Sequence, residues 1–380
     1  MTGSPFAALE SNTPESPVRT MARLDPYWHG VWATGAGAQW LSYERLQRWD
    51  QAGLIRAAQQ HRNLQVKVET AAARIRQSWQ AKLDLASALY GWKTATVAQV
   101  AALTGNLDLA VRRSRPIGDM FALSITDIGD VAGRFGIGGQ PITARMVRPS
   151  QGAAFEKLLL PQMTFAERLS VTGGEVWSSA GRYDRHNVLT MEFILRVAEF
   201  LPGVATILGE PFSKVADLLY TGTGIAPPTM GITRTGKTIP LTRTGDAVIV
   251  RDDGLRIVVE TTASVSAASL GVKANRWAEE LSRRPFDETG VVVLFLTVDK
   301  HDPFDGSIDR RITRDTAKMA RAAVDAFPGR GAMRTRDRML VASWHDLFPG
   351  PHQFGAAFTE LSAEAFVDGA WTSRSLLDRR

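Results

Sequence analysis

The chain has 380 residues, a formal net charge of +6, and an ordinary globular composition with 44% hydrophobic and 22% charged residues. This composition excludes wholesale disorder, and the length predicts two or three domains. The chain contains no cysteine, which excludes disulfides, thiolate nucleophiles, cysteine-bound zinc and iron–sulfur clusters.

Arginine supplies most of the positive charge, since only nine of the 45 basic residues are lysines. Codon bias in a GC-rich genome and phosphate binding by guanidinium groups are both open explanations. The most apolar run, 291–298, has eight residues and is too short to span a bilayer. The polar N-terminus has no signal-peptide core. We therefore expect a cytoplasmic protein without membrane contact.

The N-terminal part of the sequence is predicted to be largely helical. Residues 1–24 are polar and proline-containing, which is typical of a disordered leader. Residues 25–93 are predicted to form a helical region in which Ser42 is a candidate N-cap. An apolar stripe over 64–90 predicts one long helix with Lys82 on its charged face. We expect that face to be solvated, with DNA contact as the alternative.

Residues 94–150 show the element order of a winged helix-turn-helix. A capped helix over 96–105 ends at Gly105, a short basic helix is predicted over 108–115, and a strand over 120–124. Arg112, Arg113 and Arg115 cluster at the end of the basic helix, where they would contact DNA phosphates. A packing or dimerisation module is the alternative, and residues 43–55 are a second candidate for the DNA-reading element.

The C-terminal half is predicted to be an α/β domain. Residues 151–180 are read as a linker or arm, 181–345 as the domain, and 346–380 as a C-terminal tail. The domain begins with a helix over 186–201. Strands follow at 247–250 and 255–260, joined by a turn at 252–254. A helix over 266–283, a central strand over 290–298, a helix over 313–327 and a strand over 338–342 complete it.

An acidic pair lies at one end of the predicted hairpin. Asp246 starts the first strand and Glu260 ends the second, so the hairpin brings them together. Two carboxylates at one sheet end are suited to Mg²⁺. Many nucleases place a lysine two residues after the glutamate, but this chain has Thr262 there, and Lys273 is the only nearby substitute. Glu192 or Glu199 would be a third carboxylate.

These residues resemble the replication-relaxation family of actinobacterial and plasmid proteins. The similarity covers roughly residues 95–300. It rests on the stretch 243–250 with Asp246, the stretch 253–260 with Glu260, the helix bearing Lys273, and the segment 185–192. It implies an N-terminal winged helix followed by a domain like that of PD-(D/E)XK nucleases. Two departures are that Gly245 stands where the family has proline and that Thr262 stands where a nuclease has lysine. Without that lysine we expect weak or absent cleavage.

A second pattern, G-x-x-x-x-G-K-T, occurs at 231–238 and formally matches a phosphate-binding loop. Residues 291–299 would supply an apolar strand that ends in Asp299. The flanking prolines and the strand that follows favour another interpretation. In it, Arg234, Lys237 and Arg243 form a basic loop beside the acidic pair, where a nucleic-acid backbone would pass.

The sequence thus predicts an α/β protein with a helical N-terminal region and winged helix-turn-helix, followed by a PD-(D/E)XK nuclease-like domain around a small mixed sheet. The preferred hypothesis is a protein of a plasmid or other mobile element that binds double-stranded DNA and acts in replication, mobilisation or their control. It requires no cofactor. The enzyme alternative is a Mg²⁺-dependent DNA endonuclease with Asp246 and Glu260 as metal ligands and Lys273 as the third catalytic residue. A third alternative is a phage- or defence-related component that acts through protein partners or as a homodimer.

Overall fold

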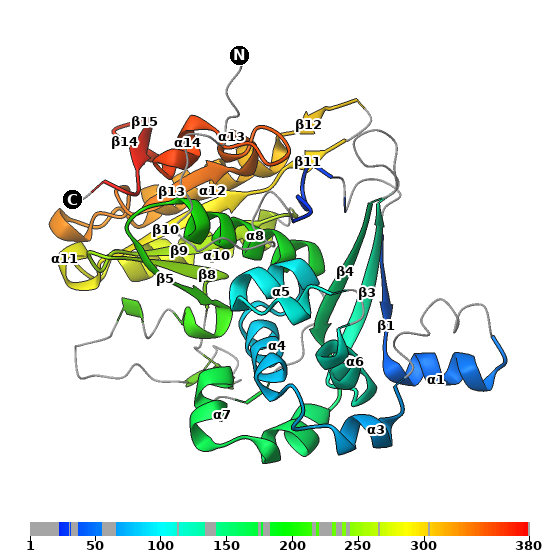
Figure 1. Cartoon of the computed structure of the whole chain (residues 1–380). Helices are drawn as coiled ribbons and strands as arrows, with labels where there is room; N and C mark the ends of the chain where they lie inside the picture. The colour runs from blue at the N-terminus through cyan, green and yellow to red at the C-terminus, as the bar shows by residue number, and fades with distance from the viewer. Residues whose placement is uncertain are drawn as a thin grey trace. The chain divides into compact units, whose positions relative to one another are not determined.

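The computed structural model describes residues 23–29, 31, 37–54, 66–111, 114–133, 142–173, 176–177, 183–214, 218–219, 230–232, 238–240, 244–264, 267–302 and 305–378. These residues form two compact units, an N-terminal and a C-terminal one. The division falls between Leu195 and Arg196, inside helix α8 (Asp184–Phe200). Figure 1 shows the elements coloured by their position in the chain.

The N-terminal unit contains a four-stranded antiparallel sheet. Its spatial order is β1 (Gly37–Leu41), β3 (Thr126–Gly133), β4 (Ile142–Pro149) and β2 (Ala95–Thr96). The first three lie side by side in Figure 1. Along the chain, α4 (Trp79–Trp92) precedes β2, and the helices α5 (Val97–Thr104) and α6 (Arg115–Ala122) lie between β2 and β3.

Two predicted helix boundaries in this unit are confirmed by their caps. The hydroxyl of Ser42 accepts the Arg45 amide at the start of α1 (Tyr43–Gln51). Helix α5 begins with a reciprocal capping box between Thr96 and Gln99, and it ends at Gly105, which adopts a φ of +69°. Glycine takes this left-handed conformation without steric cost.

The predicted single helix over 64–90 is wrong. In its place are α3 (Val68–Ala73) and α4, separated at Ser78, whose φ is +49°. Lys82 is fully buried, and its ammonium donates to the carbonyls of Arg74 (2.7 Å) and Ile75 (3.2 Å) and pairs with Asp119 at 3.2 Å. The break persists because Lys82 satisfies carbonyls that a continuous helix would bond internally. The predicted solvation of this lysine is therefore also wrong.

The predicted helix over 108–115 and strand over 120–124 are displaced along the chain. A 3₁₀ turn, η3 (Leu107–Leu109), precedes α6, which starts at Arg115 and continues to Ala122. Ser114 caps α6, and Pro116 lies in its first turn, where a missing amide proton costs nothing. The strand that follows is β3. The predicted helix ends just before Pro116, whereas in the structure Pro116 lies at the beginning of the helix.

The segment 151–180 is not a linker where the structure describes it. It contains a π-helical turn, η4 (Phe155–Leu159), a 3₁₀ turn, η5 (Leu160–Gln162), and α7 (Phe165–Thr172). The indole of Trp79 on α4 donates to Glu167 on α7 at 2.6 Å. Phe155 stacks on Trp177 with ring centroids 4.0 Å apart. The segment thus packs as part of the N-terminal unit.

The C-terminal unit is built on a seven-stranded mixed sheet. Its order is β15 (Ala370–Ser375), β14 (Ser362–Val367), β13 (Met339–Ser343), β10 (Val291–Thr297), β9 (Arg256–Thr262), β8 (Ala247–Arg251) and β5 (Val204–Gly209). β9, β10 and β13 are parallel, while all other neighbours are antiparallel. Residues 346–380 are therefore not only a tail, because β14 and β15 extend the sheet. Short elements complete the unit: η6 (Glu210–Phe212), β6 (Met230–Ile232), β7 (Thr238–Pro240), α11 (Phe286–Thr289), β11 (Lys300–His301), β12 (Ile308–Asp309), η7 (Gly331–Met333), α13 (Trp344–Leu347) and α14 (Ala356–Thr359).

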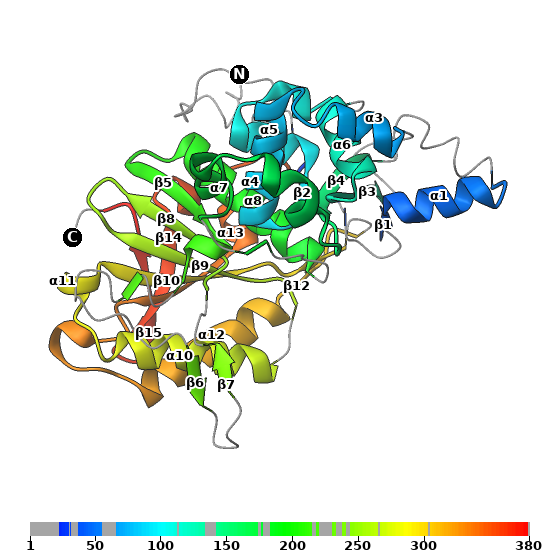
Figure 2. The same ribbon diagram turned by 90° about the horizontal axis from the view of Figure 1, so that it is seen from below.

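One face of this sheet is covered by α10 (Ala267–Leu281) and α12 (Arg311–Ala326), which lie side by side in Figure 2. Val258, Val293 and Val341 point from neighbouring strands into the same apolar core as Ala278 and Ala323. All seven residues of β10 are buried, as the uninterrupted apolar run predicts for a central strand. This core fixes the position of α10 over β9, and so the geometry of the side chains that α10 brings to the acidic pair.

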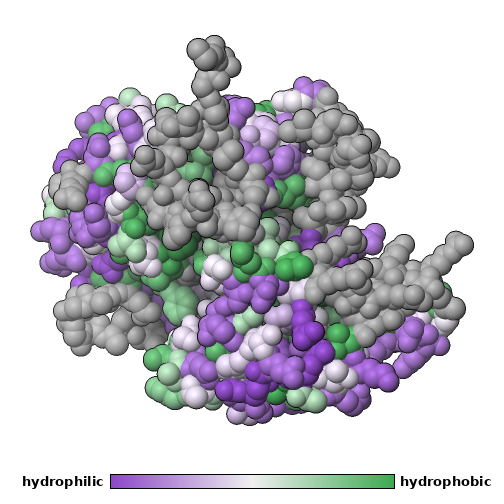
Figure 3. All heavy atoms as spheres, in the orientation of Figure 1, coloured by the Kyte–Doolittle hydropathy of each residue, from purple (hydrophilic) through white to green (hydrophobic). Residues whose placement is uncertain are grey.

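Within the described ranges, no helix combines the length and apolar character needed to cross a membrane. Figure 3 shows hydrophilic residues over much of the described surface on one face, interrupted by smaller apolar patches.

Candidate functional site

The hairpin of β8 and β9 brings Asp246 and Glu260 to the same end of the sheet. Ala247 pairs with Val259, and the Asp246 amide donates to the Val259 carbonyl at 2.9 Å. The Asp246 carboxylate also accepts the Thr261 amide at 2.7 Å. These two backbone links hold its side chain beside the residue that follows Glu260.

Helix α10 adds two side chains, Lys273 and Trp277, which are one turn apart on the same helical face. The Lys273 ammonium contacts Glu260 Oε2 and lies 3.7 Å from Asp246 Oδ2. The Trp277 indole donates to Glu260 Oε1 at 2.6 Å. Each oxygen of Glu260 thus faces a positive or proton-donating group of α10, and one ammonium interacts with both carboxylates.

Burial shapes the protonation of this cluster. Glu260 is 1% exposed, and its burial raises its pKa to about 7. The Lys273 charge opposes the increase and the Asp246 charge adds to it. For Lys273, desolvation lowers the pKa, but Glu260 and Asp246 outweigh it and hold the pKa above its ordinary value. Lys273 therefore remains an ammonium ion throughout the neutral range.

The arrangement does not fit the predicted Mg²⁺ site. The Lys273 ammonium lies between Glu260 Oε2 and Asp246 Oδ2, where it would repel a divalent cation bridging the two carboxylates, and a hard cation requires further oxygen ligands. In the part of the chain that the structure describes, no three His, Cys, Asp or Glu residues form a cluster that could hold a metal. Glu192, a candidate third carboxylate, instead pairs with Arg23 at 3.2 Å and accepts from Gln99 at 3.1 Å.

Gly245, the residue before Asp246, lies in a closely packed position. Its amide donates to the Ser213 carbonyl at 3.0 Å, a bond that proline cannot make. A Cβ atom at this position would come within 2.3 Å of a methyl group of Val258. The backbone bond and the contact with Val258 thus both favour glycine just before Asp246.

The pattern at 231–238 does not have the structural surroundings of a phosphate-binding loop. Gly231 lies in β6 and pairs with Ile239 of β7, and Thr238 pairs with Ile232. A phosphate-binding loop requires a helix after its lysine, whereas Thr238 begins a strand. Asp299 also has another role, because its carboxylate accepts the Thr313 amide (3.0 Å) in the first turn of α12.

The predicted basic residues are only partly placed. Arg115 is exposed at the first position of α6. Arg112, Arg113, Arg234, Lys237 and Arg243 lie outside the described residues. The structure therefore brings together Asp246, Glu260 and Lys273 and places Arg115 at a helix start.

The sequence prediction missed Trp277. Its spacing from Lys273 was the available signal, since residues four apart share one face of a helix. Tryptophan at that spacing is also ordinary for a buried helical face, and Trp277 is part of the core as well as a hydrogen-bond donor to Glu260.

We expect Glu260 to titrate near pH 7 and Trp277 to report it. Because its pKa is about 7 when folded and 4.5 ordinarily, the folded state binds more protons between those values. Protonated Glu260 therefore stabilises the folded state relative to the unfolded state. This contribution to the free energy of unfolding is complete below about pH 4.5 and is lost as the pH rises through about 7. Tryptophan fluorescence should change with a midpoint near 7 in the wild type and not in Glu260→Gln. Identical pH profiles of fluorescence in the two proteins would contradict the assignment.

Comparison of the chain with family models, with curated proteins and with solved structures finds no match in any of the three.

Proposed function

We propose that the chain binds double-stranded DNA through its N-terminal unit and carries a nuclease-like C-terminal unit that does not cleave DNA. In this proposal it serves replication, mobilisation or their control in a plasmid or other mobile element, as its resemblance to the replication-relaxation family implies. The proposal that the C-terminal unit does not cleave DNA is supported by one observation, the position of the Lys273 ammonium beside the two carboxylates.

The element order of the N-terminal unit supports a winged helix. The chain runs through α4, β2, α5, α6, β3 and β4, and β4 pairs with both β2 and β3. In such modules the second helix of the pair enters the major groove and the hairpin flanks it. Here that helix is α6, in which only the first residue, Arg115, is exposed and residues 116–122 are buried, so the proposed DNA contact is confined to the start of the helix. Its start is the place where arginines would hold phosphates.

The C-terminal unit supports a nuclease-like arrangement in the same way. From α8 the chain forms the antiparallel strands β5, β8 and β9, crosses through α10, and returns as β10 parallel to β9. Asp246 at the second strand and Glu260 on the third are the positions that the resemblance implies for the acidic pair. Lys273 contacts one carboxylate and lies 3.7 Å from the other, so it offsets part of their charge, which favours a docking or scaffolding role over hydrolysis.

The DNA-binding part is tested by replacing Arg112, Arg113 and Arg115 with alanine. We expect binding to every duplex sequence to weaken about equally, by roughly tenfold or more, because phosphate contacts carry no sequence information. The slope of log affinity against log salt should fall by about 0.9 for each phosphate that the variant no longer neutralises. Fluorescence anisotropy with a labelled duplex over a salt series measures both quantities.

A matched control removes three arginines from the C-terminal unit: Arg334, Arg336 and Arg374. It lowers the net charge by the same amount, and we expect duplex affinity to change less than threefold, roughly the effect of bulk charge alone. Equal losses in both triple variants would contradict binding through α6. A wild type with no salt-dependent duplex binding would contradict the function itself.

One observation favours a second function, a Mg²⁺-dependent DNA endonuclease. Many nucleases have a lysine at the position of Thr262, and here Lys273 of α10 places an amine beside the acidic pair instead. Cleavage would require Lys273 to withdraw from the carboxylate oxygens so that they become available as ligands. Plasmid DNA incubated with Mg²⁺ and either the wild type or Glu260→Gln distinguishes this function from binding alone.

A further inference from the structure

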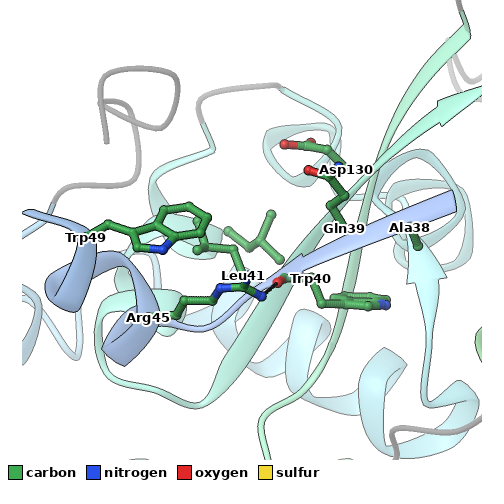
Figure 4. Close-up of a pocket in the computed structure, with 8 residues that line it drawn as sticks. Ala38, Gln39, Trp40, Leu41, Arg45, Trp49 and Asp130 are labelled. Carbon is green, nitrogen blue, oxygen red and sulfur yellow. Dashed lines mark hydrogen bonds between the residues drawn. The ribbon is translucent and has the colours of Figure 1, made fainter. Parts of the chain in front are cut away.

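A cavity of about 490 Å³ lies between β1, β3 and α1 in the N-terminal unit (Figure 4). Its floor is the cross-strand pair Leu41 and Ile128, which are 4% and 2% exposed. The next pair on the same face, Gln39 and Asp130, supplies polar groups. The volume lies in the range of sites that bind small organic ligands.

Helix α1 forms the opposite wall. Arg45 and Trp49 project from it toward the strands in Figure 4, with the Arg45 guanidinium 5.0 Å from the Trp49 ring centroid. Arg45 also donates to the Trp40 carbonyl at 3.4 Å, which ties the helix to β1. The ring of Trp40 itself turns to the other side of the strand, where its indole donates to Asp184. One indole, Trp49, therefore flanks the cavity.

These groups match the parts of a nucleotide. An indole provides a stacking surface for any base, an amide and a carboxylate can hydrogen-bond a base edge, and a guanidinium pairs with phosphate. The charge also favours an anion over a cation. Arg145 lies 3.2 Å from the Asp130 carboxylate and offsets its charge. Of the three charged residues Arg45, Asp130 and Arg145, the net charge is therefore one positive charge, which we assign to Arg45.

We infer that this cavity holds one unpaired nucleotide of a bound DNA, with its base against Trp49 and its phosphate at Arg45. The inference deepens the proposed function and rests on it in one respect, because the DNA delivers the nucleotide. The cavity would give the protein a preference for DNA with an unpaired nucleotide, which a winged helix alone does not provide. β1 pairs with β3, the first strand of the proposed wing, so DNA at α6 and the wing would be continuous with the cavity.

The test compares three ligands by fluorescence titration of the 380-residue chain at one salt concentration. They are a blunt duplex, the same duplex with one unpaired 3′ adenine, and free deoxyadenosine monophosphate. We expect the wild type to prefer the overhang by roughly tenfold, the size of a single base–aromatic stack. Trp49→Ala should abolish this preference with little effect on the blunt duplex, and Trp49→Phe should keep part of it.

Trp79→Ala is the matched control. Trp79 also lies under an arginine, with Arg76 at 4.2 Å, but its indole donates to Glu167 and it does not line the cavity. Its replacement should leave the overhang preference unchanged. An overhang preference that survives Trp49→Ala overturns the inference.

The remaining outcomes separate the inference from the proposed function. Equal binding of blunt and overhang duplexes by the wild type overturns the cavity assignment and leaves DNA binding standing. Trp49-dependent binding of the free nucleotide without duplex binding supports the cavity and contradicts the proposed function. Failure of all three ligands to bind overturns both.

Discussion

Lys273→Met is expected to convert the acidic pair into a divalent-cation site. The substitution removes the ammonium that contacts Glu260 and leaves that carboxylate and Asp246 facing each other without a counter-charge. A buried carboxylate that loses its partner is costly, and a metal ion can replace the lost charge. Loss of the Lys273 charge raises the pKa of Glu260 further, so Mn²⁺ must displace a proton there. At pH 8.5, where this competition is weaker than at neutral pH, we expect Mn²⁺ to bind at least roughly tenfold more tightly than to the wild type.

Electron paramagnetic resonance of free Mn²⁺ measures this affinity directly. Lys273→Arg is the matched control, because it keeps a cation between the carboxylates and should show no gain. Thermal unfolding provides a second readout: Lys273→Met should melt below the wild type without metal and recover when Mn²⁺ is added. Unchanged Mn²⁺ affinity in Lys273→Met would show that the ammonium does not occupy the cation position.

Arg338→Met is expected to cause the largest loss of stability. Arg338 is 1% exposed, and its guanidinium donates to the carbonyls of Val291 (3.0 Å), Leu281 (2.9 Å) and Arg284 (2.6 Å) and to the Thr289 hydroxyl (2.8 Å). Burial lowers its pKa to about 10. Methionine fills similar space but leaves these buried acceptors without a donor. We expect the free energy of unfolding to fall by about 3–5 kcal/mol.

Urea unfolding of Arg338→Met and of Arg336→Met provides the comparison. Arg336 lies two residues earlier, its side chain is 32% exposed, and it pairs with the exposed Asp368. Its replacement should cost less than about 1 kcal/mol, as for other surface ion pairs. Similar losses in the two variants would mean that the buried bonds of Arg338 do not hold α10, α11 and β10 together.

The parts of the fold that could be predicted are those with strong local signals. The run 291–298 predicts a central strand, and the turn at 252–254 predicts the hairpin that brings Asp246 to Glu260. The caps at Ser42 and Thr96 predict where helices begin. Each of these signals depends on residues close together in the chain.

The errors arise where distant residues decide the local structure. The break between α3 and α4 depends on Lys82, whose ammonium bonds to carbonyls seven and eight residues earlier and to Asp119. Strand β14 and the edge strand β15 lack an uninterrupted apolar run, and β15 has no buried residue, so they are read as a tail. In the site, Lys273 could be predicted from its order in the chain. That its ammonium would contact both carboxylates follows only from the packing of α10 on the sheet.

The most direct test of the central claim, binding of DNA without cutting it, uses supercoiled plasmid incubated with the wild type and Mg²⁺. One half of each sample is run on a native gel and the other half after removal of protein. We predict a salt-sensitive mobility shift in the first and unchanged supercoiled DNA in the second. Nicked or linear DNA that appears with the wild type and disappears with Glu260→Gln would contradict the claim and establish the endonuclease instead.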